Sequence, residues 1–489
     1  MAKVLFIQTQ KYAYPGLYYL CGALRDAGHE YRVIHALELD EVADTIQAFQ
    51  PTLIGFSVMT GPHKAILRLS SQIKQHHPDI KILLGGIHPT LAPDVLEHPA
   101  IDFICKGEGE DALVDLANTL DSNKPDFHIF NIHHKDENGA IIEMPMRSLT
   151  SVMDELPFPD YSIYADIPEV AADEYPMVYY ERGCPYTCSY CHNSDQRALY
   201  KGLGKYVRRF SVERIVAESK AALASYPKAR TVLLGADTFG AKKDFTRELL
   251  ARFQAEVGVA YTCLIRPELV TEELAQMLSE TGCHMVAFGV ESGSERLRTK
   301  ILGRKYSNST VIEAANILRT NEVSFRTYNM VGFPSETRQE MLDTLELNLK
   351  IRPDFPWASI FTPYPRTELA DYSIEHGYLS ADFSFEDVPT SFFNDTILDN
   401  VDRDFIRNIH AFFQLFVLFP FLYPLFKWVL YVPHNPLFGF IFKAVYSYVC
   451  VRSENRSIWG FLKLAFGNRH MFSRKVESNS GVTALMDSQ

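Results

Sequence analysis

Short apolar runs alternate with amphipathic stretches over residues 1–120. The runs have the length of β-strands, and the stretches between them repeat apolar positions with the period of a helix. The predicted strands are residues 4–8, 31–36, 53–58, 80–85 and 103–106, and the predicted helices are residues 17–27, 43–47, 64–76 and 112–120. Because strands that alternate with helices favour a parallel, doubly wound sheet, we predict an α/β domain over residues 1–125.

The ends of three predicted strands carry glycine, short hydroxyl side chains and a histidine. These candidate binding residues are Ser57, Thr60, Gly85, Gly86, His88 and Gly107. Ligands of doubly wound sheets bind at the carboxyl ends of the strands. Glycine lets the backbone approach a flat or phosphate-bearing ligand closely, and a hydroxyl can bond its polar edge. Each loop alone is typical of a tight turn, whereas three loops at one sheet edge indicate a binding site.

A second alternation of strands and helices follows a connector. The connector covers residues 126–175 and contains a hairpin turn signal at residues 135–139, followed by a stiff, proline-containing stretch at residues 156–161. The predicted strands after it are residues 177–180, 231–235, 260–265, 285–289, 324–331 and 357–362. About six β/α units indicate a partial (β/α)6 barrel, open on one side, over residues 176–380, with its site at the C-terminal ends of the strands.

The C-terminal part of the chain, residues 381–489, is rich in aromatic and apolar residues. Its apolar run at residues 411–433 is long enough to span a bilayer, but prolines and a lysine interrupt it, and a second apolar stretch covers residues 437–451. We expect this region to be mostly helical. Three interpretations remain open: a buried helical subdomain, an interfacial surface or apolar substrate channel, and a spanning helix. The polar tail after Ser473 is predicted to be disordered.

The composition narrows the function classes. The 489 residues carry 48 Lys and Arg against 60 Asp and Glu, which gives a formal net charge of -12. An acidic chain without a basic block argues against nucleic acid as the main partner. The N-terminus lacks the apolar length and cleavage site of a signal peptide. The cysteine spacing indicates no disulfide framework, so we expect a reducing, cytoplasmic location.

The most specific chemistry is a cysteine motif. Cys184, Cys188 and Cys191 have the spacing C-x3-C-x2-C, with no fourth cysteine nearby. Four-iron clusters normally take four thiolates, so three leave one iron with an open coordination position, where a metal site performs chemistry. A structural zinc knuckle or unrelated surface thiols are the alternatives, but zinc sites favour a second pair of ligands at zinc-finger spacing. The motif therefore predicts an enzyme.

The cysteine motif, with Tyr190 just before its last cysteine, resembles that of the radical S-adenosylmethionine (radical SAM) superfamily. Further stretches of that superfamily's type follow in order at residues 235–239, 288–294, 302–304, 331–337 and 362–365. Together with the glycine-bearing loops of the first domain, the series is similar to the cobalamin-binding radical SAM enzymes over about residues 1–380. There are two departures: residues 8–16 hold no histidine where many cobalamin domains place one, and Arg366 occupies a position where glycine is usual.

The resemblance implies three cofactors, each with its own residues. Cys184, Cys188 and Cys191 would hold a [4Fe-4S] cluster whose open iron binds S-adenosylmethionine. The implied contacts to S-adenosylmethionine are Tyr190, Asp237, Glu291 and Arg304, and the implied contacts to cobalamin are Ser57, Thr60, Gly85, Gly86, His88 and Gly107. Structural roles are alternatives for three of them: a turn or helix-cap residue for Asp237, a partner of Arg304 for Glu291, and a solvated surface residue for His88.

The resemblance favours methylation of an unactivated carbon in an apolar or biosynthetic small molecule, with methylcobalamin supplying the methyl group. Radical cyclisation or rearrangement, as in the anaerobic cyclase of tetrapyrrole synthesis, is the alternative within enzymes. A non-catalytic cobalamin-binding sensor or carrier is the alternative outside them, but it has no use for three cluster thiols. The expected partners are a hydrophobic small-molecule substrate and a reductant such as flavodoxin or ferredoxin. Peripheral membrane association through the C-terminal region is a further expectation.

Overall fold

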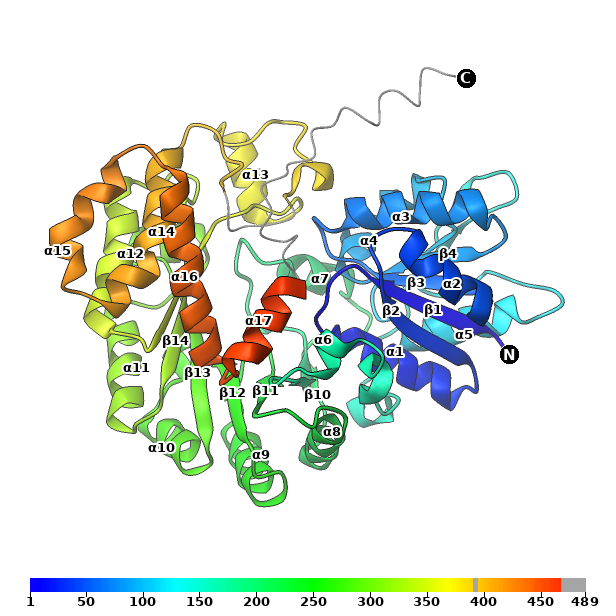
Figure 1. The fold of residues 1–489 in the computed structure, drawn as a ribbon, viewed down its shortest axis with the longest axis horizontal. Helices are drawn as coiled ribbons and strands as arrows, with labels where there is room; N and C mark the ends of the chain where they lie inside the picture. Colours follow the sequence, from blue (N-terminus) through cyan, green and yellow to red (C-terminus); the bar gives the residue numbers. More distant parts are fainter. Residues whose placement is uncertain (390–394, 468–489) are drawn as a thin grey trace.

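The computed structural model describes residues 1–389 and 395–467, and the tail predicted to be disordered after Ser473 lies outside the described residues. Two α/β units lie side by side, and a group of C-terminal helices packs on the second of them (Figure 1). The parts follow one another in the order that the sequence predicts: a doubly wound unit, a partial barrel and a helical C-terminal region.

The first sheet has the strand order β2-β1-β3-β4-β5-β6-β7. Its strands are β1 (Lys3–Gln8), β2 (Glu30–His35), β3 (Leu53–Ser57), β4 (Lys81–Gly85), β5 (Phe103–Cys105), β6 (Ile132–Lys135) and β7 (Ile141–Ile142). Its helices are α1 (Pro15–Asp26), α2 (Asp40–Phe49), α3 (His63–His76), α4 (Ile87–Leu91) and α5 (Glu110–Leu120). Strands β1 to β5 pair in parallel, which confirms the predicted doubly wound sheet.

Both faces of the first sheet are buried, because successive side chains of a strand point to opposite faces. Val4 and Phe6 of β1 join the apolar core that includes α1 and α5, whereas Leu5 and Ile7 join the core that includes α2 and α3. Since helices cover both faces, the carboxyl ends of the strands are the part of the sheet that is left to bind a ligand.

The hairpin predicted at residues 135–139 forms, and it adds two antiparallel strands to the first sheet. The carboxylate of Asp136 accepts hydrogen bonds from the backbone N–H groups of Asn138 and Ala140, both at 2.8 Å, and Gly139 has a φ of 82°. These contacts are typical of a tight turn. The sheet is therefore mixed, and the first part of the predicted connector belongs to it; short turns at Met153–Glu155 and Tyr161–Tyr164 and helix α6 (Pro168–Ala171) follow.

The second sheet has the order β15-β14-β13-β12-β11-β8, with every pair parallel. Its strands are β8 (Met177–Tyr179), β11 (Thr231–Gly235), β12 (Ala260–Ile265), β13 (Cys283–Glu291), β14 (Phe325–Val331) and β15 (Phe355–Ile360). The helices between them are α8 (Val212–Ser225), α9 (Lys243–Glu256), α10 (Glu272–Glu280), α11 (Asn308–Thr320) and α12 (Arg338–Ile351). A ribbon of β9 (Glu181–Arg182) and β10 (Arg208–Arg209) follows β8, with α7 (Asn193–Leu199) between its strands. Because β8 and β15 are the two edges of one sheet, the barrel is open as predicted.

Hydroxyl side chains fix where the helices of this unit begin. Ser211, Thr271, Ser307 and Thr337 precede α8, α10, α11 and α12, and each accepts a hydrogen bond from a backbone N–H of the first turn. Thr337 and Glu340 form a capping box, in which each side chain bonds the other residue's backbone N–H. A fixed helix start also fixes the length of the loop before it, and these loops form the top of the barrel.

The C-terminal region is helical, as predicted. Helix α13 (Glu368–Glu375) still lies in the predicted barrel segment; the C-terminal region contains α14 (Arg403–Leu418), α15 (Leu422–Phe426), a turn at Lys427–Tyr431, α16 (Pro436–Ser453) and α17 (Ile458–Gly467). The apolar run at residues 411–433 is not one helix, because α14 ends before Pro420, whose ring would disrupt its continuation. Among the described residues, no helix is long and apolar enough to cross a membrane.

Helix α16 closes the open side of the barrel. Ala287, Arg326 and Phe355 are register partners on β13, β14 and β15, so their side chains share one face of the sheet. Val449 of α16 belongs to one apolar cluster with Ala287 and Phe355, and Ser453 accepts a hydrogen bond from Arg326. On the other face, Val286 of β13 and Phe325 of β14 join the apolar cluster that includes α11. The C-terminal helices therefore complete the core that the partial barrel leaves open.

Candidate active site

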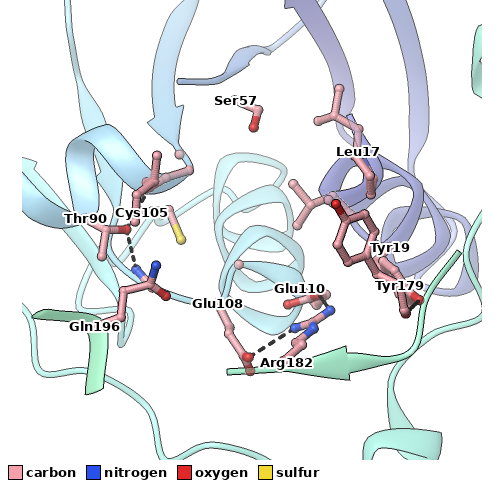
Figure 2. A pocket seen from close by; sticks show the side chains of 18 of the residues that line it. Leu17, Tyr19, Ser57, Thr90, Cys105, Glu108, Glu110, Tyr179, Arg182 and Gln196 are labelled. Carbon is pink, nitrogen blue, oxygen red and sulfur yellow. Dashed lines mark hydrogen bonds and ion pairs between the residues drawn. The ribbon is translucent and has the colours of Figure 1, made fainter. Parts of the chain in front are cut away.

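A cavity of about 610 Å³ lies between the carboxyl ends of the first sheet and the cysteine-bearing loop of the second unit (Figure 2). This volume is in the range of small-molecule and cofactor sites. The predicted residues that line it are Ser57, Gly85, Gly86, Gly107 and Asp237. The two ligand-bearing edges that the sequence predicts separately thus face one common space.

Glycine backbone forms the wall of the cavity on the side of the first sheet. Gly86 has a φ of 94°, and a Cβ atom there would lie 2.9 Å from the backbone nitrogen and oxygen of Val58. Gly107 has a φ of 89°, and a Cβ atom there would collide with the hydroxyl of Tyr200. The hydroxyl of Thr90 ties the two loops together, because it donates to the carbonyl of Gly86 at 2.7 Å and accepts from the N–H of Gly107 at 3.0 Å. The wall is therefore fixed, and it leaves room for a large ligand close to the backbone.

Two predicted contacts, Thr60 and His88, do not line this cavity. The hydroxyl of Thr60 lies 3.1 Å from Nδ1 of His88, whose ring stacks on His63 with 4.1 Å between the ring centroids. The side chain of His88 packs against α3 instead of the cavity because α4 begins at Ile87. His88 is only 1% exposed, and burial lowers its pKa from 6.5 to about 3. The neutral imidazole is thus a packing residue, not a solvated surface residue.

The start of α1 forms the floor of the cavity with Pro15, Gly16, Leu17 and Leu20. Among the described residues that line the cavity, His192 is the sole histidine, and it follows the last cysteine of the motif on the opposite side. A cofactor bound on this side would thus meet apolar side chains of α1 and no imidazole, in agreement with the missing histidine at residues 8–16.

An ion-pair network joins the two units beside the cavity. Arg182 pairs with Glu108 at 3.2 Å and with Glu110 at 2.5 Å, and Arg208 pairs with Glu108 (Figure 2). The N–H of Glu108 donates to the hydroxyl of Tyr200 at 2.8 Å. Burial alone would raise the pKa of Glu108, but the two guanidinium groups outweigh it and hold the pKa below its usual value. Sequence reasoning missed these residues, although Arg182 stands two positions before Cys184.

The cysteine loop is held from several sides. Gly183, with a φ of 82°, opens it, and a Cβ atom there would lie 2.5 Å from the carbonyl oxygen of Tyr206. The backbone of Ser189 accepts a hydrogen bond from the N–H of Leu369 at 2.9 Å and donates to the carbonyl of Leu302 at 3.3 Å. Arg197 of α7 donates to the carbonyl of Cys184. Hydrogen bonds within the chain thus hold the loop that carries the thiols.

Each of the three thiols has a polar neighbour. The hydroxyl of Thr238 lies 3.8 Å from the sulfur of Cys184, Nη1 of Arg266 lies 3.9 Å from that of Cys188, and Nδ2 of Asn193 lies 3.7 Å from that of Cys191. Burial raises the pKa of Cys184 and of Cys191.

The three-sulfur set fits an iron–sulfur cluster. In the described part of the chain, no three His, Cys, Asp or Glu side chains converge on one ion position. The thiolates of a four-iron cluster do not need to, because each of them binds a separate iron. Sequence reasoning missed Thr238, in the loop after β11, and Arg266, the residue directly after β12.

Tyr190, Glu291 and Arg304 lie together at the carboxyl end of β13. Arg304 pairs with the carboxylate of Glu291, and its Nη1 donates to the hydroxyl of Tyr190 at 2.9 Å. Glu291 has a φ of 63°, and its carboxylate occupies the space that a side chain at Gly289 would take. The buried Nε of Arg304 has no hydrogen-bond partner among the described residues. An unpartnered guanidinium N–H suits an anionic ligand group such as a carboxylate.

Asp237 lies apart from this group, at the end of β11. It lines the cavity, and Nδ2 of Asn193 donates to its Oδ2 at 3.4 Å. Burial raises the pKa of Asp237, which His192 partly offsets. The structure thus brings three of the four residues predicted to bind S-adenosylmethionine into contact, and the fourth lines the cavity beside the cysteine loop. Asp237 is not a helix cap, since α9 begins at Lys243.

Two segments of the chain match known families. Residues 178–347 match the radical SAM superfamily, and residues 9–117 match the B12 binding domain. The first segment contains the cysteine loop, Asp237, Glu291 and Arg304, and the second contains the glycine wall. The two matches therefore meet at the cavity.

Curated proteins are similar to the chain over most of its length. An uncharacterized methyltransferase of Pyrococcus horikoshii is 30% identical over 373 residues, which cover 74% of this chain and 79% of that protein. The anaerobic magnesium-protoporphyrin IX monomethyl ester cyclase of Rubrivivax gelatinosus is 25% identical over 374 residues, which cover 72% of this chain and 64% of the cyclase.

A solved structure has the same fold. The radical S-adenosylmethionine methyltransferase TsrM of Kitasatospora setae, with cobalamin and a [4Fe-4S] cluster bound, matches with a TM-score of 0.62 at 18% identity. The match covers 78% of this chain and 79% of TsrM. At this identity the likeness concerns the fold alone.

Proposed function

The chain belongs to the B12-binding radical SAM enzymes, and we propose that it transfers a methyl group to an unactivated carbon of an apolar small molecule. Its cofactors are a [4Fe-4S] cluster, S-adenosylmethionine and cobalamin. When bound, they supply a one-electron reduction, a carbon-centred radical that removes hydrogen from the substrate, and the methyl group.

The residues of the chain would bind and orient these groups. Cys184, Cys188 and Cys191 would hold the cluster, and Tyr190, Asp237, Glu291 and Arg304 would bind S-adenosylmethionine beside it. Ser57, Gly85, Gly86 and Gly107 would hold cobalamin by close backbone approach. Bound cofactors and substrate would have to fill the cavity to exclude water, which a reactive radical requires.

One observation carries the proposal. The glycine wall faces Gly183, His192 and Asn193, which flank the three cysteines, across a single cavity, so a methyl donor on one side and a radical source on the other could address one substrate. This arrangement places the reacting groups in proximity, from which enzymes derive a large part of their rate enhancement. The methyltransferase from Pyrococcus horikoshii among the relatives supports the same reaction class.

The inward face of the barrel supports an apolar substrate. Tyr328 and Trp357 are register partners on β14 and β15, with 6.2 Å between their ring centroids, and Tyr446 of α16 lies 5.0 Å from the ring of Trp357. These rings are half-buried. Met330, two residues beyond Tyr328 toward the carboxyl end of β14, is half-buried as well. An aromatic surface of this kind favours a flat or lipid-like molecule over a charged one.

Product analysis tests the proposal. Anaerobically reconstituted, reduced protein is incubated with S-adenosylmethionine and candidate apolar substrates, with flavodoxin or ferredoxin as the proposed electron donor. Methyl transfer yields both 5′-deoxyadenosine and S-adenosylhomocysteine together with a methylated product.

Two other outcomes have distinct signatures. Deoxyadenosine without S-adenosylhomocysteine contradicts methyl transfer and favours a cyclase or rearrangement reaction, for which the 25% identical cyclase of Rubrivivax gelatinosus is the supporting relative. Absence of any S-adenosylmethionine cleavage favours the sensor or carrier alternative.

A further inference from the structure

The C-terminal helices expose an unusual number of large apolar side chains. Phe421, Trp428, Leu437, Phe440, Trp459 and Phe466, which we call the C-terminal aromatic surface, are each between 58% and 76% exposed. Outside residues 419–466, Met1 is the single large apolar side chain of the described residues that is more than half exposed. Scattered exposed apolar residues are ordinary, whereas a concentration of them marks an interaction surface.

Helix α16 has two apolar faces, and the barrel covers one of them. Phe438, Phe442 and Val449 are buried toward α14 and the inward face of the second sheet. Leu437, Phe440, Ala444 and Tyr448 recur at spacings of three and four residues, so they form a second stripe, and all four are exposed. Packing against the barrel and α14 therefore explains the first face, whereas the second stays exposed, with Arg452 of the same helix as a neighbour of Tyr448.

Helix α17 also exposes apolar side chains. Ile458, Leu462 and Phe466 recur every four residues and are between 49% and 69% exposed. In Figure 1, α16 and α17 lie on the near side of the molecule with no other element drawn in front of them. The two helices contact each other, so their exposed stripes extend one surface.

The charge of this region is opposite to that of the whole protein. The sequence from residue 405 to residue 453 contains no Asp or Glu, and its charged residues are Arg407, Lys427, Lys443 and Arg452, whereas the chain carries a formal net charge of -12. Lys427 lies between Phe426 and Trp428, and Lys443 lies beside the exposed stripe of α16; both are exposed. Cations among exposed aromatic rings are complementary to an anionic apolar partner.

We propose that the C-terminal aromatic surface lies on an anionic lipid bilayer, with its rings at the depth of the lipid headgroups. Trp and Tyr favour that depth because they have an apolar body and a polar group, and Lys and Arg near it pair with anionic headgroups. The surface lies on the bilayer without crossing it, in keeping with the lengths of the described helices.

This contact has a consequence for the apolar substrate. Tyr446 of α16 touches Trp357 inside the barrel, while Phe440 and Tyr448 of the same helix face outward. A molecule that partitions into the bilayer is thus separated from the barrel by one helix. Binding to the bilayer does not rest on the proposed function, since it requires neither a cofactor nor turnover.

Vesicle flotation tests the inference on the full-length, reconstituted protein. Two preparations are compared, phosphatidylcholine alone and equal parts of phosphatidylcholine and phosphatidylglycerol, each at low and at high salt. The protein is expected to float with the anionic vesicles at low salt and to bind them about tenfold less at high salt, since salt screens the attraction. Failure to float with either preparation overturns the inference.

Paired variants identify the surface. Phe440→Ser with Trp459→Ser is expected to lower the fraction bound about tenfold or more, and Lys427→Gln with Lys443→Gln to abolish the preference for phosphatidylglycerol. The control is Phe130→Ser, which removes an exposed aromatic ring from the first unit and is expected to change neither. Iron content and melting temperature check that each variant is folded.

Self-association is the competing occupant of the surface. If light scattering shows a dimer that Phe440→Ser converts to a monomer, and neither protein floats with vesicles, a second copy of the chain covers the surface and the membrane inference is wrong.

Discussion

The two walls of the cavity share one architecture and differ in chemistry. Both stand at the carboxyl ends of parallel strands. The wall from the first sheet is mainly glycine backbone and small side chains, whereas the other presents Arg182, Asp237 and the polar side chains that follow the cysteine motif, with the three thiols next to them in the sequence. A large, preformed cofactor needs room and backbone contact, while cluster ligation and radical formation need side chains that donate and pair. The difference separates a binding wall from a reacting wall.

The supports behind the walls differ in the same way. Thr90 fixes the glycine loops through neutral hydrogen bonds at 2.7 and 3.0 Å. On the reacting wall, Glu291 is held by the guanidinium of Arg304, and backbone bonds from Leu302 and Leu369 hold the cysteine loop. Substitutions on one wall are therefore expected to affect one cofactor and spare the other.

The largest effect is expected at the cysteines. Cys188→Ala removes one of three cluster thiolates, so iron content and S-adenosylmethionine cleavage should fall to background, a loss of about a thousandfold or more. Cobalt retention should be unchanged, because the binding wall is intact. Cys283→Ala is the control, since this half-buried thiol lies outside the site. Normal cleavage by Cys188→Ala would show that the motif does not hold the cluster.

The binding wall is tested at Gly85. A Cβ atom there would meet nothing closer than 3.8 Å, so Gly85→Leu is tolerated by the fold but extends a side chain into the cavity. Overpacking a ligand site costs about 1–3 kcal/mol, which predicts roughly a tenfold to hundredfold loss in cobalamin affinity. Cobalt retained after desalting measures it, with iron content as the internal reference. Gly439→Leu, which also has free space but lies on α16, should keep its cobalt.

Substitution of Arg304 tests whether its contacts with Glu291 and Tyr190 serve S-adenosylmethionine binding. Arg304→Lys keeps the positive charge but removes the planar guanidinium group that contacts Glu291 and Tyr190. The same group is proposed to contact S-adenosylmethionine. Affinity for S-adenosylmethionine, measured by equilibrium dialysis, should fall about tenfold, with iron and cobalt contents unchanged. Arg252→Lys, on the exposed face of α9, is the matched control. An unchanged affinity would assign Arg304 a purely structural role.

The smallest effect concerns His88, which the structure places outside the site. Because burial holds its pKa at about 3 in the folded protein, the unfolded chain binds a proton near pH 6.5 that the folded chain does not. Lowering the pH therefore favours unfolding, by about 1 kcal/mol for this residue between pH 7 and roughly pH 5.5. His88→Gln should lose that part of the pH dependence in denaturant unfolding without affecting cobalt retention. A loss of cobalt in His88→Gln would show that His88 contributes to cobalamin binding after all.

The sequence predicted the strands well because buried parallel strands are short, continuous apolar runs. It predicted both the hairpin at residues 135–139 and the strand at residues 103–106, but not that the two pair, because a turn signal is local and β5 lies outside the hairpin. The division of the run at residues 411–433 followed from its prolines. What covers the outer faces of the C-terminal helices could not be read from the pattern.

The site was predicted where a short motif carries it and missed where distant residues meet. The three cysteines are such a motif, whereas the pair of Arg182 with Glu108 joins positions that no local pattern connects. The sequence also could not show the direction of a side chain: His88 was predicted to face the ligand, but it packs against His63 of α3.

The structure explains why an arginine can stand at position 366, where glycine is usual. Arg366 has a φ of 72°, a conformation that favours glycine, and its guanidinium donates to the carbonyl of Leu91 at 2.8 Å. The side chain thus bridges the barrel and the first unit, a contact that glycine could not make.

We expect one protein molecule to hold a [4Fe-4S] cluster at the cysteine loop and a cobalamin at the glycine wall. Iron, sulfide and cobalt are measured in desalted protein after anaerobic reconstitution with hydroxocobalamin. The account predicts about four iron and about one cobalt per chain. Iron without cobalt would contradict the assignment of the glycine wall, and cobalt without iron would contradict the assignment of the cysteine loop.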